Sequence, residues 1–541
     1  MRLRIIYIFC LFVSFVINAQ QGFHVFPKND PTNPGTKTGD GSMTNPWDLQ
    51  TAFHNSDNNI KPGDTLWLHE GVYHGRYVSS LSGTKNDYIT VSAYRNNRVT
   101  LNGNVKSDQN TVLEVKGDYV IYKNFEITWI GDFSRDQNDS MFEVCSGIRH
   151  LSGVNCKFYD LEIHDNPGLG IGSWRHGAGT VIENCRIYNN GFIAKNGKGR
   201  GEGIYVQNKS DEIRLLKNNV IFNNYYKGIE VWSAGKRAKS EYVKNIRLEG
   251  NIVFNSGSPA GRHYDNVIIA SDDRNGLNVA KDITVVNNIF YHNTRQPNGN
   301  LIGDAPSLTI GFNRKAPVQN VVVKDNLITG GYNGLRLLYA NSLTFKNNLV
   351  YTGIVQLNPE LEQSHKGWNF ENNSFYSKRT KLFRVRTIGD KSLEGWEEAY
   401  GLGRGSVLHS LSDFKPEPVI KIVQHTQNPQ IFTMALFDET STGVRVDFSE
   451  YDLVLGQAYK ILDVENPNVI IKTGQLNADM QIFIPMDGSE FKTPMHNTKA
   501  KKTMSDFGVY RIEFESLEKI EVKAQQESKS FFKRLFGWLG F

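Results

Sequence analysis

Short runs of apolar and β-prone residues recur along the chain, and an asparagine precedes many of them. The frames ENCRIY, KNNVIF, EGNIVF, VNNIFY, KDNLIT, KNNLVY and ENNSFY place it at Asn184, Asn219, Asn251, Asn288, Asn326, Asn348 and Asn373. Two earlier frames, KNFEIT and YDLEIH, put Asn124 and Asp160 in the same place. Successive steps are 36, 24, 35, 32, 37, 38, 22 and 25 residues. Such a period is typical of solenoid architectures, and the longer steps indicate the same repeat carrying inserted loops.

A second β-run follows the first within each repeat, after a turn. These runs read GLGIGSW, GEGIYVQ, KGIEVW, DNVIIAS, SLTIGF and NGLRLLY. Two or three short strands per repeat, with no helical period between them, predict the coils of a parallel β-helix. A leucine-rich repeat is the main alternative, but its leucine frame and helical segment are missing. Coils of a β-helix stack at ~4.8 Å, so the asparagines are expected to form a hydrogen-bonded ladder in an internal turn.

The flanking segments complete an all-β prediction with several parts. Separated β-runs after about residue 412 alternate with Asn, Pro and Gly turns, which favours a small β-sandwich. The stretch SLEGWEEAYGLG predicts a short helix before it. The expected organisation is a signal peptide at 1–19, a cap with the first coils at 20–110, a β-helix at 111–376, a linker with the short helix at 377–411, a sandwich at 412–525, and an amphipathic tail at 526–541.

The first residues have the pattern of an export signal. Arg2 and Arg4 precede an apolar run at 5–17, and a small residue, Ala19, marks the expected cleavage site. The mature protein is therefore expected to be secreted, periplasmic or on the cell surface. No later apolar run is long enough to span a membrane, so no transmembrane segment is expected.

Net charge and cysteine content bear on possible binding partners and on disulfide pairing. Without the two leader arginines, 61 minus 2 basic residues against 56 acidic ones leave a formal charge of +3, which does not favour nucleic acid. Cys10 lies in the expected leader, which leaves Cys145, Cys156 and Cys185. An odd number of cysteines cannot all pair within one chain, so we expect these three to be buried core residues. A monomer is expected.

Several of these features resemble one known group of proteins. The export signal, the segments GSMTNPWDLQTAF and KPGDTLWLHEGVYHG, and the Asn-framed coils resemble secreted right-handed parallel β-helix proteins of the pectate-lyase-like superfamily. The N-terminal segment is most similar to the chondroitinase-B and alginate-lyase type. The resemblance covers roughly residues 22–376. It implies an extracellular polysaccharide as partner, but the superfamily includes lyases, hydrolases, epimerases and adhesins, so the fold does not settle the function.

Strand alternation predicts which residues of the second β-runs face outward. One column holds Gly172, Tyr205, Glu230, Ile268, Thr309 and Arg336, and a second holds Trp174, Gln207, Trp232, Ala270, Gly311 and Leu338. The positions just before the strands add Glu202, Lys227 and Asp265. Inserted loops flank these coils and carry basic residues, among them Arg200 and Arg262. Functional residues concentrate on such loops, although a solvated basic surface is the alternative.

These residues suit β-elimination of an anionic polysaccharide, which needs a cation to neutralise the uronate, a base and a proton donor. Lyases of this superfamily commonly use Lys or Arg, often with calcium. The resemblance therefore implies Lys227, Arg200 or Arg336 as base or neutraliser and Tyr205 as donor. Calcium is the expected cofactor, with Glu202, Glu230 and Asp265 as ligands. His176 and His263 are further candidates for the base.

Two other functions remain open. A glycoside hydrolase would use paired carboxylates, with Glu202 beside either Glu230 or Asp265, and sequence spacing does not choose between retaining and inverting geometry. A non-catalytic glycan-binding or adhesive protein would use the same face without chemistry. Trp174, Trp232, Arg336 and Arg262 are the expected substrate-binding residues, the tryptophans by stacking on sugar rings; packing under a loop is the alternative. Asp272 and Asp273 are interpreted as a turn rather than a metal site.

Overall fold

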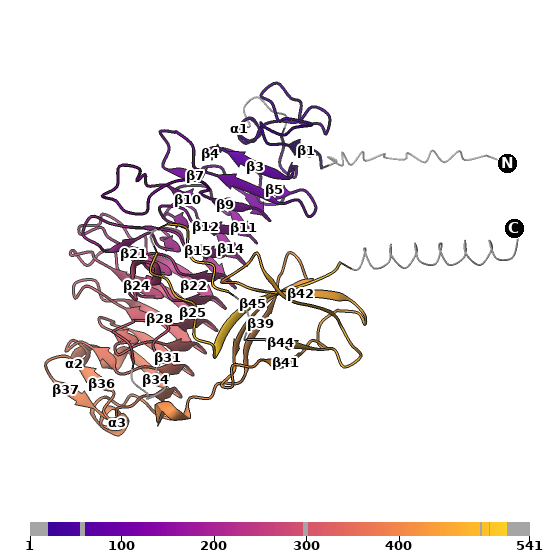
Figure 1. Cartoon of the computed structure of the whole chain (residues 1–541). Coiled ribbons are helices and arrows are strands. Elements are labelled where there is room, and N and C mark those ends of the chain that lie inside the picture. Colours follow the sequence, from indigo (N-terminus) through magenta and orange to yellow (C-terminus); the bar gives the residue numbers. More distant parts are fainter. Residues whose placement is uncertain (1–19, 55–59, 296–300, 487–489, 497, 517–541) are drawn as a thin grey trace, which may run out of the picture.

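The computed structural model describes residues 20–54, 60–295, 301–486, 490–496 and 498–516. Within them, three long sheets of 12 strands each enclose a common core, and an antiparallel unit lies against one side (Figure 1). The chain visits sheet A, sheet B and sheet C in turn, and each circuit is one coil. This arrangement confirms the predicted all-β parallel β-helix. The predicted signal peptide at 1–19 and tail at 526–541 lie outside the described residues.

The strands of the three sheets are given in the order of the chain. Sheet A contains β1 (Gly22–Val25), β2 (Thr65–Leu68), β5 (Ile89–Ala93), β8 (Val120–Lys123), β11 (Lys157–Tyr159), β14 (Val181–Glu183), β19 (Arg214–Lys217), β22 (Lys244–Glu249), β25 (Lys281–Val286), β28 (Gln319–Lys324), β31 (Leu343–Lys346) and β34 (Trp368–Glu371). Sheet B contains β3 (Gly71–His74), β6 (Val99–Asn102), β9 (Glu126–Thr128), β12 (Glu162–His164), β15 (Arg186–Tyr188), β20 (Val220–Phe222), β23 (Ile252–Phe254), β26 (Ile289–Tyr291), β29 (Leu327–Thr329), β32 (Leu349–Tyr351), β35 (Ser374–Tyr376) and β38 (Val407–His409). Sheet C contains β4 (Tyr77–Ser79), β7 (Thr111–Val115), β10 (Ser146–His150), β13 (Ile171–Ser173), β18 (Ile204–Val206), β21 (Ile229–Ser233), β24 (Val267–Ser271), β27 (Leu308–Ile310), β30 (Leu335–Leu337), β33 (Val355–Leu357), β36 (Phe383–Val385) and β37 (Gly389–Lys391).

A hairpin, short helices and 3₁₀ turns lie between the strands of the coils. A hairpin of β16 (Phe192–Ile193) and β17 (Gly199–Arg200) projects before β18. The helices are α1 (Leu49–Phe53), α2 (Leu361–Ser364) and α3 (Leu393–Tyr400), with 3₁₀ turns η2 (Ser258–Ala260), η3 (His365–Gly367) and η4 (Leu411–Asp413). Among the described residues, no helix has the length and apolar character needed to cross a membrane.

The core consists of columns of aliphatic side chains that repeat from coil to coil. In sheet C, Ile171 pairs with Ile204, Ile204 with Ile229, and Ile229 with Val267. All four side chains are fully buried. Because successive strand residues point to opposite faces, this inward column fixes their neighbours as outward. The predicted inward and outward positions of these strands are confirmed.

The asparagine ladder lies in the turn between sheets A and B. The Nδ2 of each member donates to the Oδ1 of the next, at 2.9 to 3.1 Å. The same nitrogen donates to a carbonyl of the preceding coil; Asn288, for example, bonds the Leu248 oxygen at 3.0 Å. Buried amides are thereby satisfied in both directions. The members are Asn219, Asn251, Asn288, Asn326, Asn348 and Asn373.

Three residues assigned to the ladder from sequence lie one position before it. Asn124, Asp160 and Asn184 have φ values of 64°, 51° and 57° and are the left-handed turn residues of their coils. In the coil of Asn184, the ladder position is Cys185, whose backbone N–H donates to Asn219 Oδ1 at 3.0 Å. Asn and Asp tolerate this backbone region, so the turn and the ladder favour the same residue types. The sequence assignment is wrong at these three positions for that reason.

A second, shorter ladder lies in the turn that leads into sheet C. Asn166 Nδ2 donates to Asn190 Oδ1 at 2.9 Å, and Asn190 Nδ2 donates to Asn224 Oδ1 at 3.0 Å. All three side chains are fully buried. This ladder stiffens the backbone immediately before the strands β13, β18 and β21. The three unpaired cysteines are also buried, as predicted.

The last coil is closed by aromatic packing. Ser392 caps α3 by accepting from the Gly395 N–H at 3.1 Å. Trp396 of α3 is fully buried and stacks on Phe383, with ring centroids 4.6 Å apart. The predicted short helix is thus present and covers the end of the core. The segment 377–411, expected as a linker, also adds β36, β37 and β38 to the sheets.

The C-terminal domain is antiparallel, as expected for a β-sandwich. Its main sheet has the order β39 (Val419–Gln424), β40 (Ile431–Phe437), β45 (Phe507–Phe514), β42 (Ala458–Asp463) and β43 (Ile470–Gln475), and β41 (Val444–Asp447) pairs with β44 (Gln481–Ile484). It packs on the outer face of sheet B. The Phe507 ring stacks on Tyr291, with ring centroids 4.1 Å apart, and its centroid lies 5.9 Å from that of Phe254.

A strap from this domain, residues 490–496 and 498–506, crosses the turns between sheets B and C (Figure 1). Arg135 Nε donates to the Met495 oxygen at 2.6 Å. The Tyr225 hydroxyl donates to the oxygen of His496 at 3.2 Å, and the Lys499 N–H donates to the Pro259 oxygen at 2.9 Å. The domain therefore contacts the β-helix along several coils.

Candidate active site

The predicted outward column of sheet C is continuous in the structure. Strand pairing places Gly172 beside Tyr205, Tyr205 beside Glu230, and Glu230 beside Ile268. The column continues to Thr309 and Arg336. Neighbouring strands are ~4.8 Å apart, so side chains on adjacent coils are within contact distance.

Lys227 and Glu230 form a buried ion pair at the centre of this face. The Lys227 ammonium contacts Glu230 Oε1, and the two residues are only 7% and 5% exposed. The ammonium also lies 4.6 Å from the ring centre of Tyr226 and 5.4 Å from that of Trp232. Burial lowers the pKa of Lys227, but the charge of Glu230 outweighs burial, so this pKa is raised above its ordinary value. Lys227 therefore stays protonated.

Glu202 lies against the same pair from the preceding coil and is partly exposed. Burial, the charge of Glu230 and a hydrogen bond between the two side chains raise the pKa of Glu202 well above its usual range. A hydrogen bond between two carboxyl groups requires a proton on one of them. The raised pKa of Glu202 favours its protonated form, beside the Glu230 carboxylate that pairs with Lys227.

Aromatic and amide groups surround the pair. Gln207 Nε2 donates to the Tyr205 hydroxyl at 2.9 Å and to the Trp232 oxygen at 3.1 Å. The rings of Trp174 and Tyr205 lie 4.8 Å apart. Burial and the charge of Glu230 raise the pKa of Tyr205, so its hydroxyl stays a donor. Trp174 and Trp232 are partly exposed.

The remaining carboxylate, Asp265, faces the next coil. It is 8% exposed and accepts a hydrogen bond from the Thr309 hydroxyl. Among the described residues, no three His, Cys, Asp or Glu side chains gather closely enough to hold a metal ion. The ammonium of Lys227 occupies the space beside Glu230 that a cation would need. Calcium binding by Glu202, Glu230 and Asp265 therefore stays a prediction.

The basic candidates lie at different places. Arg200, on the hairpin strand β17, has its guanidinium 5.7 Å from the ring centre of Tyr226, beside the pair. Arg336 lies three coils after Glu230 in the same column and 3.9 Å from Asp304. Arg262 is exposed in the loop after η2. Only Arg200 of these three comes close to the carboxyl pair.

The histidine and aspartate candidates have local roles. His176 is exposed on the turn after β13, where burial and the charge of Arg175 lower its pKa. His263 packs edge-on against the buried His292, with ring centres 4.9 Å apart. Asp273 accepts the N–H groups of Leu277 and Asn278 at 2.9 and 2.8 Å, which supports the turn interpretation.

Sequence reasoning missed two contributors to the site. Tyr226 contacts both Lys227 and Arg200, and it packs on Tyr264 at 4.7 Å. Gln207 was placed in the outward column but given no role. The available signal was the aromatic pair in FNNYYKG, directly before the charged strand.

A comparison with protein-family models agrees with the fold. A family model described as "Right handed beta helix region" matches residues 74–253. Similar solved structures include a pectate lyase, 16% identical over 68% of this chain and 78% of that chain, with a TM-score of 0.41. An alginate lyase from Paenibacillus is 18% identical over 67% of this chain and 96% of that chain, with a TM-score of 0.34. A surface adhesin of Streptococcus pneumoniae is 12% identical over 66% of this chain and 95% of that chain, with a TM-score of 0.45. No curated protein sequence matches significantly. The family match and the three coiled sheets confirm the predicted right-handed parallel β-helix.

Proposed function

We propose that the protein is a glycoside hydrolase that cleaves an extracellular polysaccharide with Glu202 and Glu230. The observation that supports this most directly is the placing of Glu202 and Glu230 on adjacent coils, with the Lys227 ammonium paired to Glu230. Glycosidases need one carboxylic acid to protonate the leaving oxygen and one carboxylate on the other side of the reaction. The raised pKa of Glu202 suits the acid.

The separation of the two groups favours a retaining reaction. Glu202 and Glu230 belong to adjacent coils, whose strands are ~4.8 Å apart. This spacing is nearer the ~5 to 5.5 Å of retaining enzymes than the ~6.5 to 9.5 Å of inverting ones. Glu230 would attack the anomeric carbon while Glu202 protonates the glycosidic oxygen. Glu202 would then activate the water that releases the sugar. Trp174 and Trp232 offer partly exposed rings on which sugars stack.

A lyase is the second candidate, and one observation favours it. Arg200 and Lys227 bring two cations to the ring of Tyr226, and the Tyr205 hydroxyl belongs to the adjacent strand beside Glu230. Such a set could supply the neutraliser and the proton donor that β-elimination requires. Lys227 suits the role of neutraliser, since its raised pKa leaves no free amine to act as a base near neutral pH.

One assay separates the two reactions. The protein is incubated with neutral, uronate-bearing and sulfated polysaccharides, and new reducing ends are measured beside the absorbance of unsaturated uronates. We expect reducing ends without that absorbance, and activity that survives EDTA. Unsaturated products would overturn the hydrolase in favour of the lyase, and loss of activity in EDTA would support the calcium prediction.

Variants identify the residues. Glu202→Gln and Glu230→Gln are each expected to lower kcat by about 10² to 10⁴-fold, the usual contribution of a positioned acid or base.

Azide should rescue Glu230→Ala and yield a glycosyl azide, as expected of a missing nucleophile. The control is Glu114→Gln, because Glu114 lies in the same outward column three coils before Tyr205. No product from any polysaccharide would leave a binding protein instead.

A further inference from the structure

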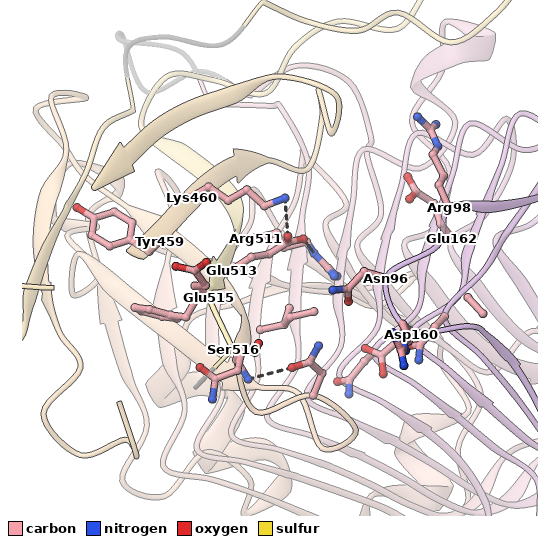
Figure 2. A pocket seen from close by; sticks show the side chains of 18 of the residues that line it. Asn96, Arg98, Asp160, Glu162, Tyr459, Lys460, Arg511, Glu513, Glu515 and Ser516 are labelled. Carbon is pink, nitrogen blue, oxygen red and sulfur yellow. Dashed lines mark hydrogen bonds and ion pairs between the residues drawn. The ribbon is translucent and has the colours of Figure 1, made fainter. Parts of the chain in front are cut away.

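A cavity of about 1200 Å³ lies between the β-helix and the C-terminal domain. It contains none of the candidate active-site residues. Figure 2 shows Asn96, Arg98, Asp160 and Glu162 of the β-helix facing Lys460, Arg511 and Glu513 of the C-terminal domain. The first group comes from the turns between sheets A and B and from the starts of sheet B strands. The two parts of the protein thus build the cavity together.

The charges on its walls are balanced and paired. The lining residues include five basic ones, Arg95, Arg98, Arg186, Lys460 and Arg511, and five acidic ones, Glu126, Asp160, Glu162, Glu513 and Glu515. Ion pairs join Lys460 to Glu513 at 2.8 Å, Arg511 to Glu513 at 2.5 Å, and Arg186 to Glu162 at 2.5 Å. Paired charges leave no net field to attract an ionic ligand. The cavity is therefore polar without being selective for anions or cations.

Two buried side chains on the cavity wall keep unused hydrogen-bonding capacity. His425 contacts Asp160 Oδ1 at 2.6 Å, but Asp160 Oδ2 has no partner among the described residues. Asn184 is 3% exposed, and neither atom of its amide has a partner there. Its neighbour Cys185, at the ladder position of this coil, has no side-chain amide. Buried polar groups of this kind call for a partner.

The rest of the wall is rich in amides. Asn96, Asn97, Asn428, Gln475 and Asn477 also line the cavity. An amide donates and accepts at once, and a carboxylate oxygen accepts; hydroxyl groups complement both. The volume exceeds the ~300 to 1,000 Å³ of typical small-ligand sites, so it suits a chain of several sugar units rather than one.

We propose that this cavity is a second glycan site, which binds an uncharged oligosaccharide through Asp160, Asn184 and the surrounding amides. The C-terminal domain then supplies half of a binding site as well as covering sheet B. The site is separate from the carboxyl pair and does not depend on the proposed hydrolysis.

The test uses the full chain carrying Glu202→Gln, so that no probe is cleaved. Neutral hexasaccharides of glucose, xylose, mannose and galactose are titrated by calorimetry, with hexagalacturonate as the charged probe. Asn184→Gly removes the amide and keeps a residue suited to the left-handed turn. Asn218→Gly is the matched control, because Asn218 has the same turn position in the next coil, with φ 55°. Trp232→Ala removes binding at the sheet C face.

We expect at least one neutral hexasaccharide to bind, with affinity at least ten-fold weaker in Asn184→Gly and unchanged in Asn218→Gly. Asp160→Asn, which keeps the shape of the side chain, serves if Asn184→Gly lowers the thermal midpoint. Absence of binding by every neutral probe would overturn the proposal. It would also be overturned if Asn184→Gly and Asp160→Asn both bound the probe as tightly as the parent protein. Binding lost only in Trp232→Ala would place the probe on the sheet C face. Failure of the hydrolysis assay would leave these results unaffected.

Discussion

At the scale of single residues, the neighbours of the carboxyl pair set its behaviour. Lys227 lowers the pKa of Glu202, although burial and Glu230 dominate in the other direction. Lys227→Met should therefore raise the pKa of Glu202 further and move the alkaline limb of the pH profile of kcat/KM to higher pH. We also expect kcat to fall by about 10²-fold, because Glu230 loses its cation. Lys195→Met, in the exposed hairpin turn, is the control; an unmoved alkaline limb in Lys227→Met would contradict the pairing.

His164 gives the folded state a defined dependence on pH. It lies between Asp165 and Glu126, at 2.8 and 2.7 Å. Burial lowers its pKa, but the hydrogen bonds to both carboxylates prevail and raise the pKa of His164 to about 9. A histidine with a raised pKa contributes stability that is complete below pH ~6.5 and is lost as the pH passes about 9. The thermal midpoint should fall across this window.

His164→Gln tests this assignment, since it removes the titrating group. The midpoint of that variant should be lower at pH 6 and flatter between pH 6.5 and 9.5 than the midpoint of the parent. His74→Gln, an exposed histidine of sheet B, should keep the parent's slope. Equal slopes in all three proteins would assign the pH dependence to other groups.

At the scale of elements, the ladder is the most sensitive feature of the coils. Asn288→Ala would leave the buried Asn251 backbone N–H without its acceptor. It would also remove one hydrogen bond each from the Asn251 amide and the Asn326 oxygen. An orphaned group costs about 1 to 3 kcal/mol and the lost hydrogen bonds add to this cost, so we expect a loss of about 2 to 5 kcal/mol in the free energy of unfolding by urea. Asn347→Gly, at an adjoining turn position, should change it by less than about 1 kcal/mol. Similar losses in both would show that the ladder bonds are not the cause.

The elements could be predicted largely because strand alternation has a period of two. Ile204, Ile229 and Val267 follow from it directly, and their outward neighbours follow with them. The ladder was predicted one residue early at Asn184, because turn and ladder accept the same residue type. The contact between Lys227 and Glu230 was not predicted, since it depends on the side-chain conformations of two residues that lie three positions apart. The cavity beside Asp160 depends on the C-terminal domain, whose position no local pattern encodes.

At the scale of the whole molecule, the C-terminal domain and the β-helix share one packed interface. Phe507 is 2% exposed and packs between Tyr291 and Phe437. Phe507→Ala should cost about 3 to 5 kcal/mol, the usual range for a buried phenylalanine. We expect a lower thermal midpoint and earlier cleavage near the strap in limited proteolysis. Phe483→Ala, at a side chain that is 37% exposed, is the control; equal effects would argue against a shared interface.

The strap extends this interface toward the active site. It binds Tyr225, the residue before Tyr226, and Pro259 in the loop that leads to Asp265. The short ladder therefore fixes the turns before the strands of the site, and a segment of the second domain contacts the same turns from outside.

The long ladder makes the coils after the active site interchangeable. Asn326 and Asn348 occupy equivalent positions 22 residues apart, so one circuit of the chain begins and ends on the same amide. Removing that circuit would offer Asn288 an identical acceptor in Asn348, while the coils of Glu202, Glu230 and Asp265 lie upstream of the cut. The length of such a molecule is thus a count of equivalent units, and it can change by whole circuits while the reactive face keeps its geometry.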